Sequence, residues 1–376
     1  MKEFNTTFLE KLKKIDPCLL ICTTILSLIS ILLMIGVRDA SEIGNSTRVI
    51  AMQSATTFVG IILAFFISTL DYQEIVNKLF IPFFIAQIGL LGITLLYGTA
   101  EGSNQSWLYI GPIGIQPSEF VKATFIVTFA KHIDIVKKKI NHPLSVLGLL
   151  IHAGLVIGLI LLSGDLGVAL VYCGLVLIML FCAGISLFYL LGGFAFLFVA
   201  IPYVWPHLNS YQQDRIIFGF TPEADPQGYG FQALLGQKCV ANGGFFGQGL
   251  NGGEYYKNLF ACENDFAFSS LCEKFGMLGG IIVIATLAVL VVRIFMIAKA
   301  ARKDSGSFLC IGVAAAITVQ AIENIGMSLA MLPVVGITLP FVSYGGSSTL
   351  AMYIMIGMVH SVHAHRVKYF FEREET

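Results

Sequence analysis

Charge is scarce in this sequence. Only 12% of the 376 residues are Asp, Glu, Lys or Arg, and 56% are hydrophobic, whereas soluble domains carry roughly 25% charged residues. The 23 basic and 23 acidic residues cancel, so the chain has no excess positive charge with which to hold a nucleic acid. This composition predicts a polytopic membrane protein.

Paired cysteine motifs are also missing. The eight cysteines are scattered, without the CxxC or Cys/His spacing of a metal–thiolate site. Most lie in apolar stretches, where cysteine behaves as a small core residue. Three of them, Cys239, Cys262 and Cys272, share one long connection. A disulfide among these three stays open as an alternative if that connection is extracytoplasmic.

The sequence contains many long hydrophobic runs. A helix of about 20 mostly apolar residues spans a bilayer, and the first run follows an amino-terminal segment without a small-residue cleavage site, which indicates a start-transfer helix. Ten stretches qualify as spans: 18–37, 50–70, 79–98, 117–131, 144–163, 166–183, 186–205, 276–297, 307–332 and 340–363.

The distribution of basic residues sets the orientation. The fourth stretch is short and contains Glu119 and Lys122, but omitting it would put Lys137–Lys139 outside, against the preference of basic residues for the cytoplasmic face. With it, 16 of the 23 basic residues are inside. We therefore predict an all-α polytopic membrane protein of about ten transmembrane helices, with both termini cytoplasmic, as a single domain over residues 1–376.

One connection is far longer than the others. Residues 206–275, between the seventh and eighth spans, form a long extracytoplasmic loop rich in Gly, Pro, Tyr and Phe. Loops of this length are usually functional or disordered. Because it has no low-complexity run, we expect an ordered lid that lies partly on the membrane, with aromatic side chains that cover a site or anchor the loop at the interface: Phe231, Phe245, Phe246, Phe266 and Phe268.

The predicted topology brings several polar, Gly- and Pro-containing segments to the outer face. One such segment says little, because Gly-rich loops and Pro at helix boundaries are common. Their shared position predicts a site at the outer membrane surface, assembled from several loops. The segments are WLYIGPIGIQPSEFVK (107–122), SGDLG (163–167), YQQDRIIFGFTPEADPQGYGFQ (211–232), NGGFFGQGL (242–250), ENDFAFSSLCEKFG (263–276) and MLPVVGITLPFVSYGGSS (331–348).

Ionisable residues at membrane depth are costly and mark functional sites. Glu119 and Lys122 lie three residues apart on the helix that begins at Pro117, so they can pair with each other. A direct role at a substrate, with Lys122 near a pyrophosphate, is the alternative. Asp165 can cap the helix that follows it or help to hold a cation.

Asp265 is the strongest candidate for chemistry. It lies at the membrane rim beside aromatic residues, and apolar surroundings raise the pKa of a carboxyl group toward that of a useful general base. The alternative is an N-cap for the helix that begins near Phe266. We expect its neighbour Glu263 to be solvated.

Polar residues inside the spans have structural explanations. His152 is predicted to be a core histidine with satisfied hydrogen bonds. Gln320, Glu323 and Asn324 fall within the ninth span, where polar groups without partners cost several kcal/mol. We expect them to form a buried hydrogen-bond network.

The outer segments, taken in order, resemble the signature segments of the SEDS proteins (shape, elongation, division and sporulation) from about residue 17 to 366. LPFVSYGGSS after NIGM is the most specific match. Within the family, KIDP before the first span, PEADPQGYG and NIGM are more similar to RodA than to FtsW or SpoVE. Three segments depart from the family pattern: SGDLG replaces QPDLG, Glu273–Lys274 replaces a pair of glutamates, and Gln237–Lys238 replaces Gln–Ser.

The resemblance implies a peptidoglycan glycosyltransferase of the bacterial cytoplasmic membrane. Such an enzyme polymerises lipid II onto an undecaprenyl-linked glycan chain at the outer face and works with a class B penicillin-binding protein, a transpeptidase. The family's presumed catalytic aspartate corresponds to Asp265, its functional Glu and Lys to Glu119 and Lys122, and its DLG aspartate to Asp165.

Further predictions complete this expected site. Lys122, Arg215 or a divalent cation, Mg²⁺ or Mn²⁺, would neutralise the departing pyrophosphate, and Asp165 and Asp265 would be the metal ligands. No organic cofactor is expected. The SYGG segment supplies a binding loop with Ser343, Tyr344 and Gly345.

Two other classes of function stay open. A lipid II flippase would suit ten spans with charged residues at membrane depth, but the sequence has no internal repeat and its strongest motifs lie on one face. A non-catalytic scaffold for a division or elongation complex would not need a charged cluster at the membrane rim.

Overall fold

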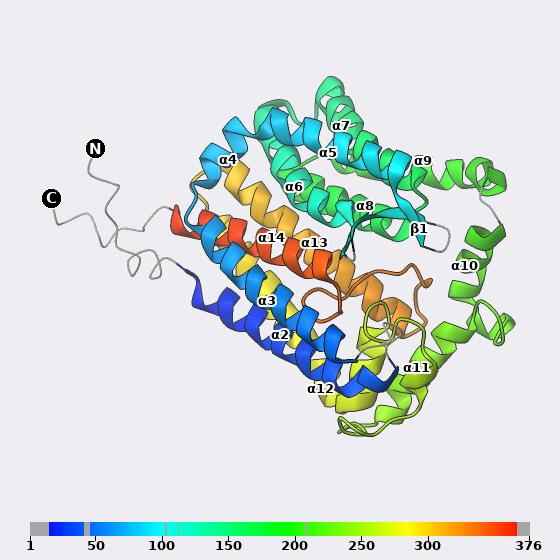
Figure 1. The fold of residues 1–376 in the computed structure, drawn as a ribbon. Helices are drawn as coiled ribbons and strands as arrows, with labels where there is room; N and C mark the ends of the chain where they lie inside the picture. Colours follow the sequence, from blue (N-terminus) through cyan, green and yellow to red (C-terminus); the bar gives the residue numbers. More distant parts are fainter. Residues whose placement is uncertain (1–14, 41–45, 102–103, 112, 208–209, 367–376) are drawn as a thin grey trace, which may run out of the picture.

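The computed structural model describes residues 15–40, 46–101, 104–111, 113–207 and 210–366. Helices dominate these ranges (Figure 1), and a long helix coincides with each of the ten predicted spans, as expected for an all-α polytopic membrane protein. The long helices are α2 (Pro17–Val37), α3 (Ser46–Ser68), α5 (Phe80–Tyr97), α6 (Pro117–Val136), α7 (Pro143–Leu162), α8 (Leu166–Ala183), α9 (Leu187–Val204), α12 (Ala267–Lys299), α13 (Asp304–Ser328) and α14 (Gly346–Ala364).

The helix boundaries follow local chemistry. Helices α2, α6 and α7 each begin with proline, whose missing N–H costs nothing at the first helical position. Asp16 caps α2 through a hydrogen bond from the Leu19 N–H, and Ser186 caps α9 in the same way. Helix α8 ends at Gly184, which adopts the left-handed conformation that glycine tolerates at a helix end.

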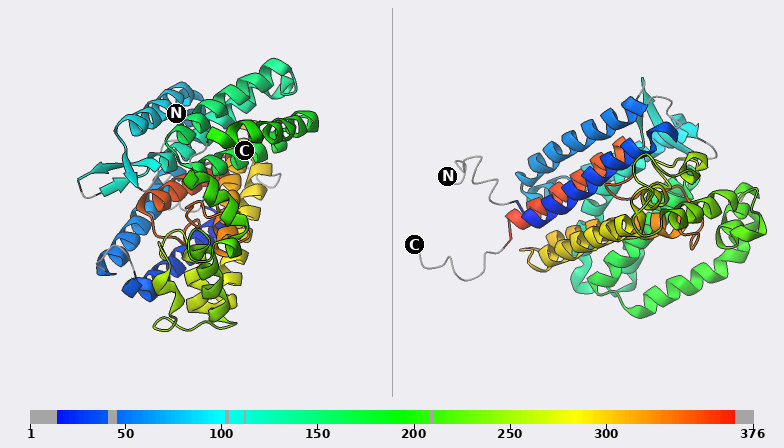
Figure 2. Two further views of the ribbon diagram at one scale, coloured as in Figure 1. Left: turned by 90° about the vertical axis from the view of Figure 1, so that its right-hand side faces the viewer. Right: turned by 90° about the horizontal axis from the view of Figure 1, so that it is seen from below.

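The first and last spans meet at one end of the bundle. The Asp16 N–H donates to Nδ1 of His360, near the end of α14, and Arg293, near the end of α12, binds the Asp16 carboxylate. Lys137, which follows α6, pairs with Asp304 at the start of α13. These basic residues identify this end as the cytoplasmic face. Figure 2 shows that the elements of the long loop gather at the opposite end.

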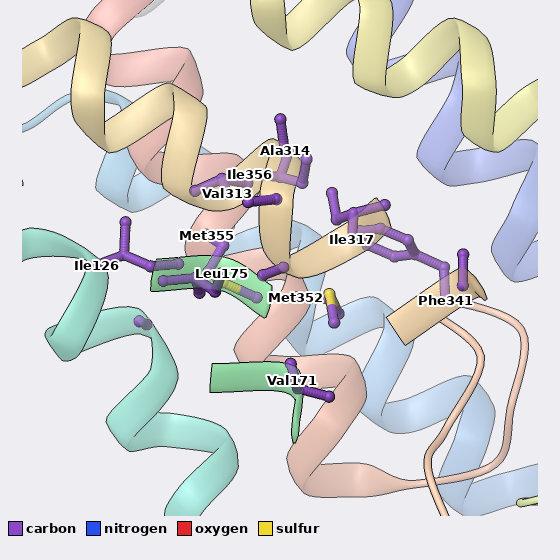
Figure 3. Close-up of a cluster of buried hydrophobic side chains, with 14 of the residues drawn as sticks. Ile126, Val171, Leu175, Val313, Ala314, Ile317, Phe341, Met352, Met355 and Ile356 are labelled. Atoms are coloured by element: carbon purple, nitrogen blue, oxygen red, sulfur yellow. The ribbon is translucent and has the colours of Figure 1, made fainter. Parts of the chain in front are cut away.

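Helix α13 is the centre of the bundle. In its most apolar 18-residue window 78% of the residues are buried, compared with at most 50% in the other candidate spans of the described chain. Figure 3 shows its side chains packed against α6, α8, α14 and the segment before α14. Gly174 of α8 allows this close packing, because a Cβ there would lie 2.8 Å from Val319. The labelled core residues are Ile126, Val171, Leu175, Val313, Ala314, Ile317, Phe341, Met352, Met355 and Ile356.

The connections contain more regular structure than the sequence predicted. A three-stranded antiparallel sheet in the order β1-β2-β3 joins α5 to α6. The described part of the long loop contains helices, as expected of an ordered segment. These elements are β1 (Thr99–Glu101), β2 (Asn104–Ile110), β3 (Ile113–Ile115), α10 (Ser210–Phe220), α11 (Phe231–Gly243) and, as short helical turns, η1 (Arg38–Ala40), α4 (Tyr72–Lys78), η2 (Lys137–Lys139), η3 (Trp205–His207), η4 (Pro222–Ala224) and η5 (Tyr255–Asn258).

Five predicted span boundaries are wrong by four residues or more. Helix α3 begins at Ser46 rather than 50, and α6 ends at Val136 rather than 131. The other three lie at the outer ends of α12, α13 and α14. Helix α12 begins at Ala267 rather than 276, because residues 267–275 are already helical and the chain only breaks at Gly276, where φ is 71°. Helix α13 ends at Ser328 rather than 332, and α14 begins at Gly346 rather than 340. Between α13 and α14 two prolines interrupt the apolar sequence, and proline disfavours helical conformation in the residue before it.

Candidate functional site

The segment that carries Asp265 is fixed to the rest of the protein by its backbone. The carbonyl oxygens of the three consecutive residues 263–265 each accept a hydrogen bond. The donors are the Tyr344 N–H at 2.8 Å, the Ser343 hydroxyl at 2.6 Å and Nδ2 of Asn324 at 2.8 Å. Two of these donors belong to the SYGG segment and the third to α13, so distant parts of the chain determine where Asp265 lies.

The Asp265 side chain is partly exposed at the outer end of α12. The N-cap of α12 is Phe266, which makes no side-chain cap bond, so Asp265 lies one residue outside the capping position. Gly336, with φ of +74°, passes close to the carboxylate, because a Cβ added there would lie 3.2 Å from Asp265 Oδ2. The missing side chain at Gly336 therefore leaves room beside the carboxylate.

The aromatic residues expected to cover this site divide into two groups. Phe266 and Phe268 are buried in the core, with 2% and 4% exposure. Phe231, Phe245 and Phe246 are exposed on the long loop, and the rings of the last two pack edge to face. Only the second group is available to contact lipid or a substrate.

Gln53, a buried residue of α3, binds the backbone of the SYGG segment. Its Nε2 donates to the Ser343 carbonyl at 3.3 Å and to Ser30 Oγ at 3.0 Å, and its Oε1 accepts from the Gly345 N–H at 3.4 Å. The Ser343 hydroxyl also accepts from the Leu339 N–H. Ser343, Tyr344 and Gly345 thus support the Asp265 segment. Sequence reasoning missed Gln53, although a lone glutamine in an apolar span is a signal for a buried polar contact.

Glu119 and Lys122 form a buried ion pair on α6. The Lys122 ammonium donates to both carboxylate oxygens of Glu119, at 3.0 and 2.9 Å, and to Oε1 of Gln320 on α13 at 3.1 Å. Lys122 has no exposed surface and Glu119 is 3% exposed. The three hydrogens of the ammonium are used inside the protein, so this geometry corresponds to the pairing alternative rather than to a contact with a pyrophosphate.

Asp165 is the N-cap of α8. Its Oδ1 accepts from the Val168 N–H at 3.1 Å and its Oδ2 from Nε2 of Gln116 at 3.3 Å. The side chain is 5% exposed, and this burial raises the pKa of its carboxyl group. Gly167 allows the start of α8 to approach the 335–337 segment, because a Cβ there would lie 2.5 Å from the Val335 carbonyl oxygen. Asp165 and Asp265 therefore both lie near this segment.

The remaining predicted site residues have different outcomes. Arg215 belongs to α10, but its side chain lies outside the described residues. The expectation that Glu263 is solvated is wrong, because this residue is 3% exposed and its Oε2 accepts from the Cys262 thiol. His152 is confirmed as a core histidine in hydrogen-bond contact with Thr128 and His132. None of the eight cysteines, all within the described ranges, forms a disulfide.

The Glu273–Lys274 pair, which departs from the family pattern, fastens the Gly-rich part of the long loop. The Glu273 carboxylate accepts hydrogen bonds from Asn242 Nδ2 and from the N–H groups of residues 254–256. The Lys274 ammonium donates to two loop carbonyls, of Leu250 and Gly252, and lies 3.7 Å from the centre of the Tyr256 ring. The positive charge of Lys274 is thus directed to the loop.

Buried polar atoms without a partner are concentrated near Asp265. Such atoms are rare in folded proteins, and each costs free energy. Five of the eight found among the described residues lie on the outer half of α13 or next to Asp265, so the predicted network in the ninth span is only partly satisfied. They are Asn264 Oδ1, Gln320 Nε2, Glu323 Oε2, Asn324 Oδ1 and Ser328 Oγ.

An apolar groove of about 680 Å³ runs between α12 and α13. Thr318 is the one polar side chain in its lining, and the groove extends to Met331 and Leu332 beyond the outer end of α13. Its apolar lining suits contact with a hydrophobic substrate or partner.

The described part of the chain contains no cluster of three or more His, Cys, Asp or Glu side chains that could hold a metal ion. This does not conflict with a magnesium-type site, because Mg²⁺ typically takes one or two carboxylates and completes its shell with water and substrate phosphates. Of the two expected ligands, Asp265 is partly exposed and Asp165 is buried and already accepts two hydrogen bonds.

The fold and site define a multi-pass protein of the cytoplasmic membrane with polar machinery at its outer face. A family model described as "Cell cycle protein", which covers FtsW, RodA and SpoVE, matches residues 13–368. The chain belongs to this family, the SEDS peptidoglycan glycosyltransferases.

Relatives come from three branches of the family. Stage V sporulation protein E of Bacillus subtilis is 34% identical over 81% of this chain and 84% of its own length. The probable peptidoglycan glycosyltransferase FtsW of Trichlorobacter lovleyi is 31% identical over 94% of both chains. The peptidoglycan glycosyltransferase MrdB of Escherichia coli K12 is 31% identical over 96% of both.

Solved structures share this fold over most of the chain. A chain of a peptidoglycan synthase complex that coordinates polymerization and crosslinking has a TM-score of 0.78 and 28% identity, and the match covers 93% of this chain and 97% of that one. The rod shape determining protein RodA of Thermus thermophilus has a TM-score of 0.68 and 25% identity, with 94% and 98% covered.

Proposed function

We propose that this protein polymerises lipid II into glycan strands at the outer face of the cytoplasmic membrane. The 4-hydroxyl of lipid II attacks the anomeric carbon of the growing chain's reducing-end sugar, the bond to undecaprenyl pyrophosphate breaks, and the hydroxyl proton passes to Asp265. The observation that carries this proposal is a partly exposed carboxylate at the outer end of α12, next to Gly336, on a segment that three separate hydrogen bonds hold in place.

Asp265 suits the role of general base because it is an acceptor in a fixed position. A base must lie within hydrogen-bond reach of the proton it removes, and placing the reacting groups accounts for a large part of many rate enhancements. Glu119, Lys122 and Asp165 act in this scheme as support: their contacts join α6 to α13 and the start of α6 to the start of α8.

The pyrophosphate leaving group is negatively charged and needs a positive charge nearby. Lys122 cannot supply it, because its ammonium is fully used inside the protein. We assign this role to Arg215 and to a divalent cation, Mg²⁺ or Mn²⁺. Asp265 and substrate phosphate oxygens are its most accessible ligands, and Asp165 would contribute only after its present hydrogen bonds are exchanged. The bound cation would neutralise charge that develops on the leaving group.

We assign the partner to the class B penicillin-binding proteins, which would crosslink the emerging strand, in keeping with the similarity to a chain from a peptidoglycan synthase complex. We further propose the RodA-like role in cell elongation, on the basis of KIDP, PEADPQGYG and NIGM. The relatives divide among the three branches at near-equal identity. Complementation of strains depleted of the elongation, division or sporulation protein tests this role: rescue of rod shape alone supports it, and rescue of septation or sporulation alone overturns it.

The polymerase proposal is tested with purified protein and fluorescent lipid II, with and without a class B penicillin-binding protein and with Mg²⁺ or Mn²⁺. We expect glycan strands on a gel from the wild type and from Glu254→Gln, which changes an exposed carboxylate of the same loop. Asp265→Asn should insert normally and lose at least about 100-fold in rate, the scale of general-base catalysis.

Two results would overturn the proposal. Strand synthesis by Asp265→Asn at the wild-type rate removes Asp265 from the base role. No strands under any condition, together with lipid II transfer across a vesicle membrane, would instead support the flippase.

A further inference from the structure

We propose that Asn324 is a positioning residue that sets the place of the Asp265 carboxylate; this inference rests on the proposed function. Asn324 lies on α13 with no exposed surface. Its Nδ2 donates to the carbonyl of Asp265 itself at 2.8 Å and to the carbonyl of Ile337 at 2.6 Å. One amide group thus gives its two hydrogens to two segments that are 72 residues apart in sequence.

Both carbonyls belong to backbone next to the Asp265 carboxylate. One is the carbonyl of Asp265, and the other is that of Ile337, the residue after Gly336. Gly336 lies so close to the carboxylate that a Cβ there would be 3.2 Å from Oδ2 of Asp265. Movement of the Asn324 amide would therefore shift both the base and the backbone that packs against it. Tyr344 and Ser343 hold the two preceding carbonyls, whereas Asn324 holds the carbonyl of the base residue itself.

The chemistry at position 324 requires a donor with two hydrogens. Neither carbonyl belongs to a helix or a strand, so neither has a regular backbone partner, and an unpaired buried carbonyl is costly. The amide oxygen of Asn324 has no hydrogen-bond partner of its own. Both donor hydrogens of the side chain are bonded while its acceptor is not, which indicates that its donor side is what the site uses.

Asn324 also relates the base to the Glu119–Lys122 pair. Gln320, which accepts from Lys122, is four residues earlier on α13, and residues at this spacing share one helix face. The same face of α13 therefore carries the contact to α6 and the contact to Asp265. Because the helix is rigid, it fixes the position of the Glu119–Lys122 pair relative to that of Asp265.

The test uses Asn324→Leu, which removes both donors at similar size, and Asn324→Ser, which keeps one hydrogen. Ser328→Ala is the matched control, because Ser328 is buried one turn further along α13 and its hydroxyl has no partner. We expect kcat for strand synthesis to fall about 10- to 100-fold in Asn324→Leu, the scale of a small misplacement of reacting groups. Asn324→Ser should lie between this variant and the wild type, and Ser328→Ala should match the wild type.

Two further readouts separate positioning from a general structural role. The KM for lipid II should stay within about threefold of the wild type, because the lost interaction acts in the transition state. Hydrogen–deuterium exchange should rise in residues 261–268 and 335–345 of the variants and stay unchanged elsewhere. A wild-type kcat in both folded variants overturns the inference, as does a change confined to KM or to melting temperature.

Failure of the proposed function gives a different pattern. If the wild type makes no strands, or if Asp265→Asn is fully active, the polymerase scheme is wrong, while the exchange data still show whether Asn324 holds the Asp265 segment. If the wild type is active, Asp265→Asn is inactive and Asn324→Leu is as active as the wild type, only the positioning role fails.

Discussion

Lys122 shows at the residue scale how a charge is kept inside a membrane protein, since its ammonium is bound by Glu119 and Gln320 and has no exposed surface. Lys122→Met would leave the Glu119 carboxylate buried without a counter-charge, which typically costs about 3–5 kcal/mol. We expect a marked fall in the unfolding temperature of the purified protein. The double variant Glu119→Gln/Lys122→Met should recover most of it.

The double variant also separates support from substrate contact. If the pair only supports the fold, the folded double variant should retain strand synthesis. A stable double variant without activity would mean that the charge of Lys122 acts directly on the substrate, and the structural role assigned to the pair would then be wrong.

Asp165 gives a prediction about pH. Burial raises the pKa of its carboxyl group above the unfolded value of 3.8, so the folded state holds the proton more tightly than the unfolded state. The contribution of this group to stability is therefore fully present below pH 3.8 and is lost as the pH rises through the raised pKa. Asp165→Asn keeps a cap for the Val168 N–H and removes this titration.

The measurement is the free energy of unfolding of the wild type and Asp165→Asn across the acidic range. As the pH rises, we expect the free energy of unfolding of the wild type to fall relative to that of Asp165→Asn. The difference should then level off. A difference that stays constant, or that changes in favour of the wild type, would contradict the assigned direction of the pKa.

At the scale of elements, helix α12 is broken where the Gly-rich loop joins it. The N–H groups of Met277 and Leu278 donate to the carbonyls of Gly244 and Phe245. On the other side of the break, two N–H groups of the loop donate to the carbonyls of Glu273 and Lys274. The loop thus supplies the partners that a broken helix lacks, as the interior of a membrane protein requires.

This junction predicts a sharp cost for Gly276→Ala. A Cβ there would lie 2.3 Å from the Phe245 carbonyl oxygen. The residue has φ of 71° and ψ of −173°, a region that is essentially restricted to glycine and costs other residues about 1–3 kcal/mol before any clash. We expect lower thermal stability and faster hydrogen exchange in residues 244–249. Gly89→Ala is the control, since a Cβ in that position meets nothing within 4 Å; equal effects of the two changes would refute the role of the junction.

The same element shows what sequence could predict. Hydropathy and basic residues identified ten spans and their orientation, because both depend on local composition. The start of α12 and the break at Gly276 were not predictable, because the contacts that stabilise them come from distant parts of the chain. Asn324, Ser343 and Tyr344 hold the segment before α12, and the Gly-rich loop supplies the partners at the break. For the same reason Asp265 was identified as a candidate from its surroundings in sequence, while the contacts from Gln53 and Asn324 that fix the site needed the fold.

At the scale of the whole molecule, the bundle is tied at both membrane faces. Outside, the segment before α14 holds the start of α12 through Ser343 and Tyr344. Inside, Asp16 accepts from Arg293 of α12 at 2.9 and 2.6 Å, and its N–H donates to His360 of α14. Hydrogen bonds therefore fix the position of α12 relative to α14 at both ends. At the inner end the connection runs through Asp16, so α2 is joined to both helices.

The inner contact can be tested with a double-mutant cycle of Asp16→Asn and Arg293→Gln. Because the two side chains are bonded directly, we expect non-additive losses of stability, with a coupling energy of about 1–3 kcal/mol. Asp265 lies just before α12 and Arg293 lies on it, 28 residues later. At 1.5 Å per residue this separates them by roughly 40 Å. The kcat of the folded variants should therefore equal that of the wild type. If kcat falls while the protein stays folded, the inner contact is coupled to the base across the membrane, and the two faces do not work independently.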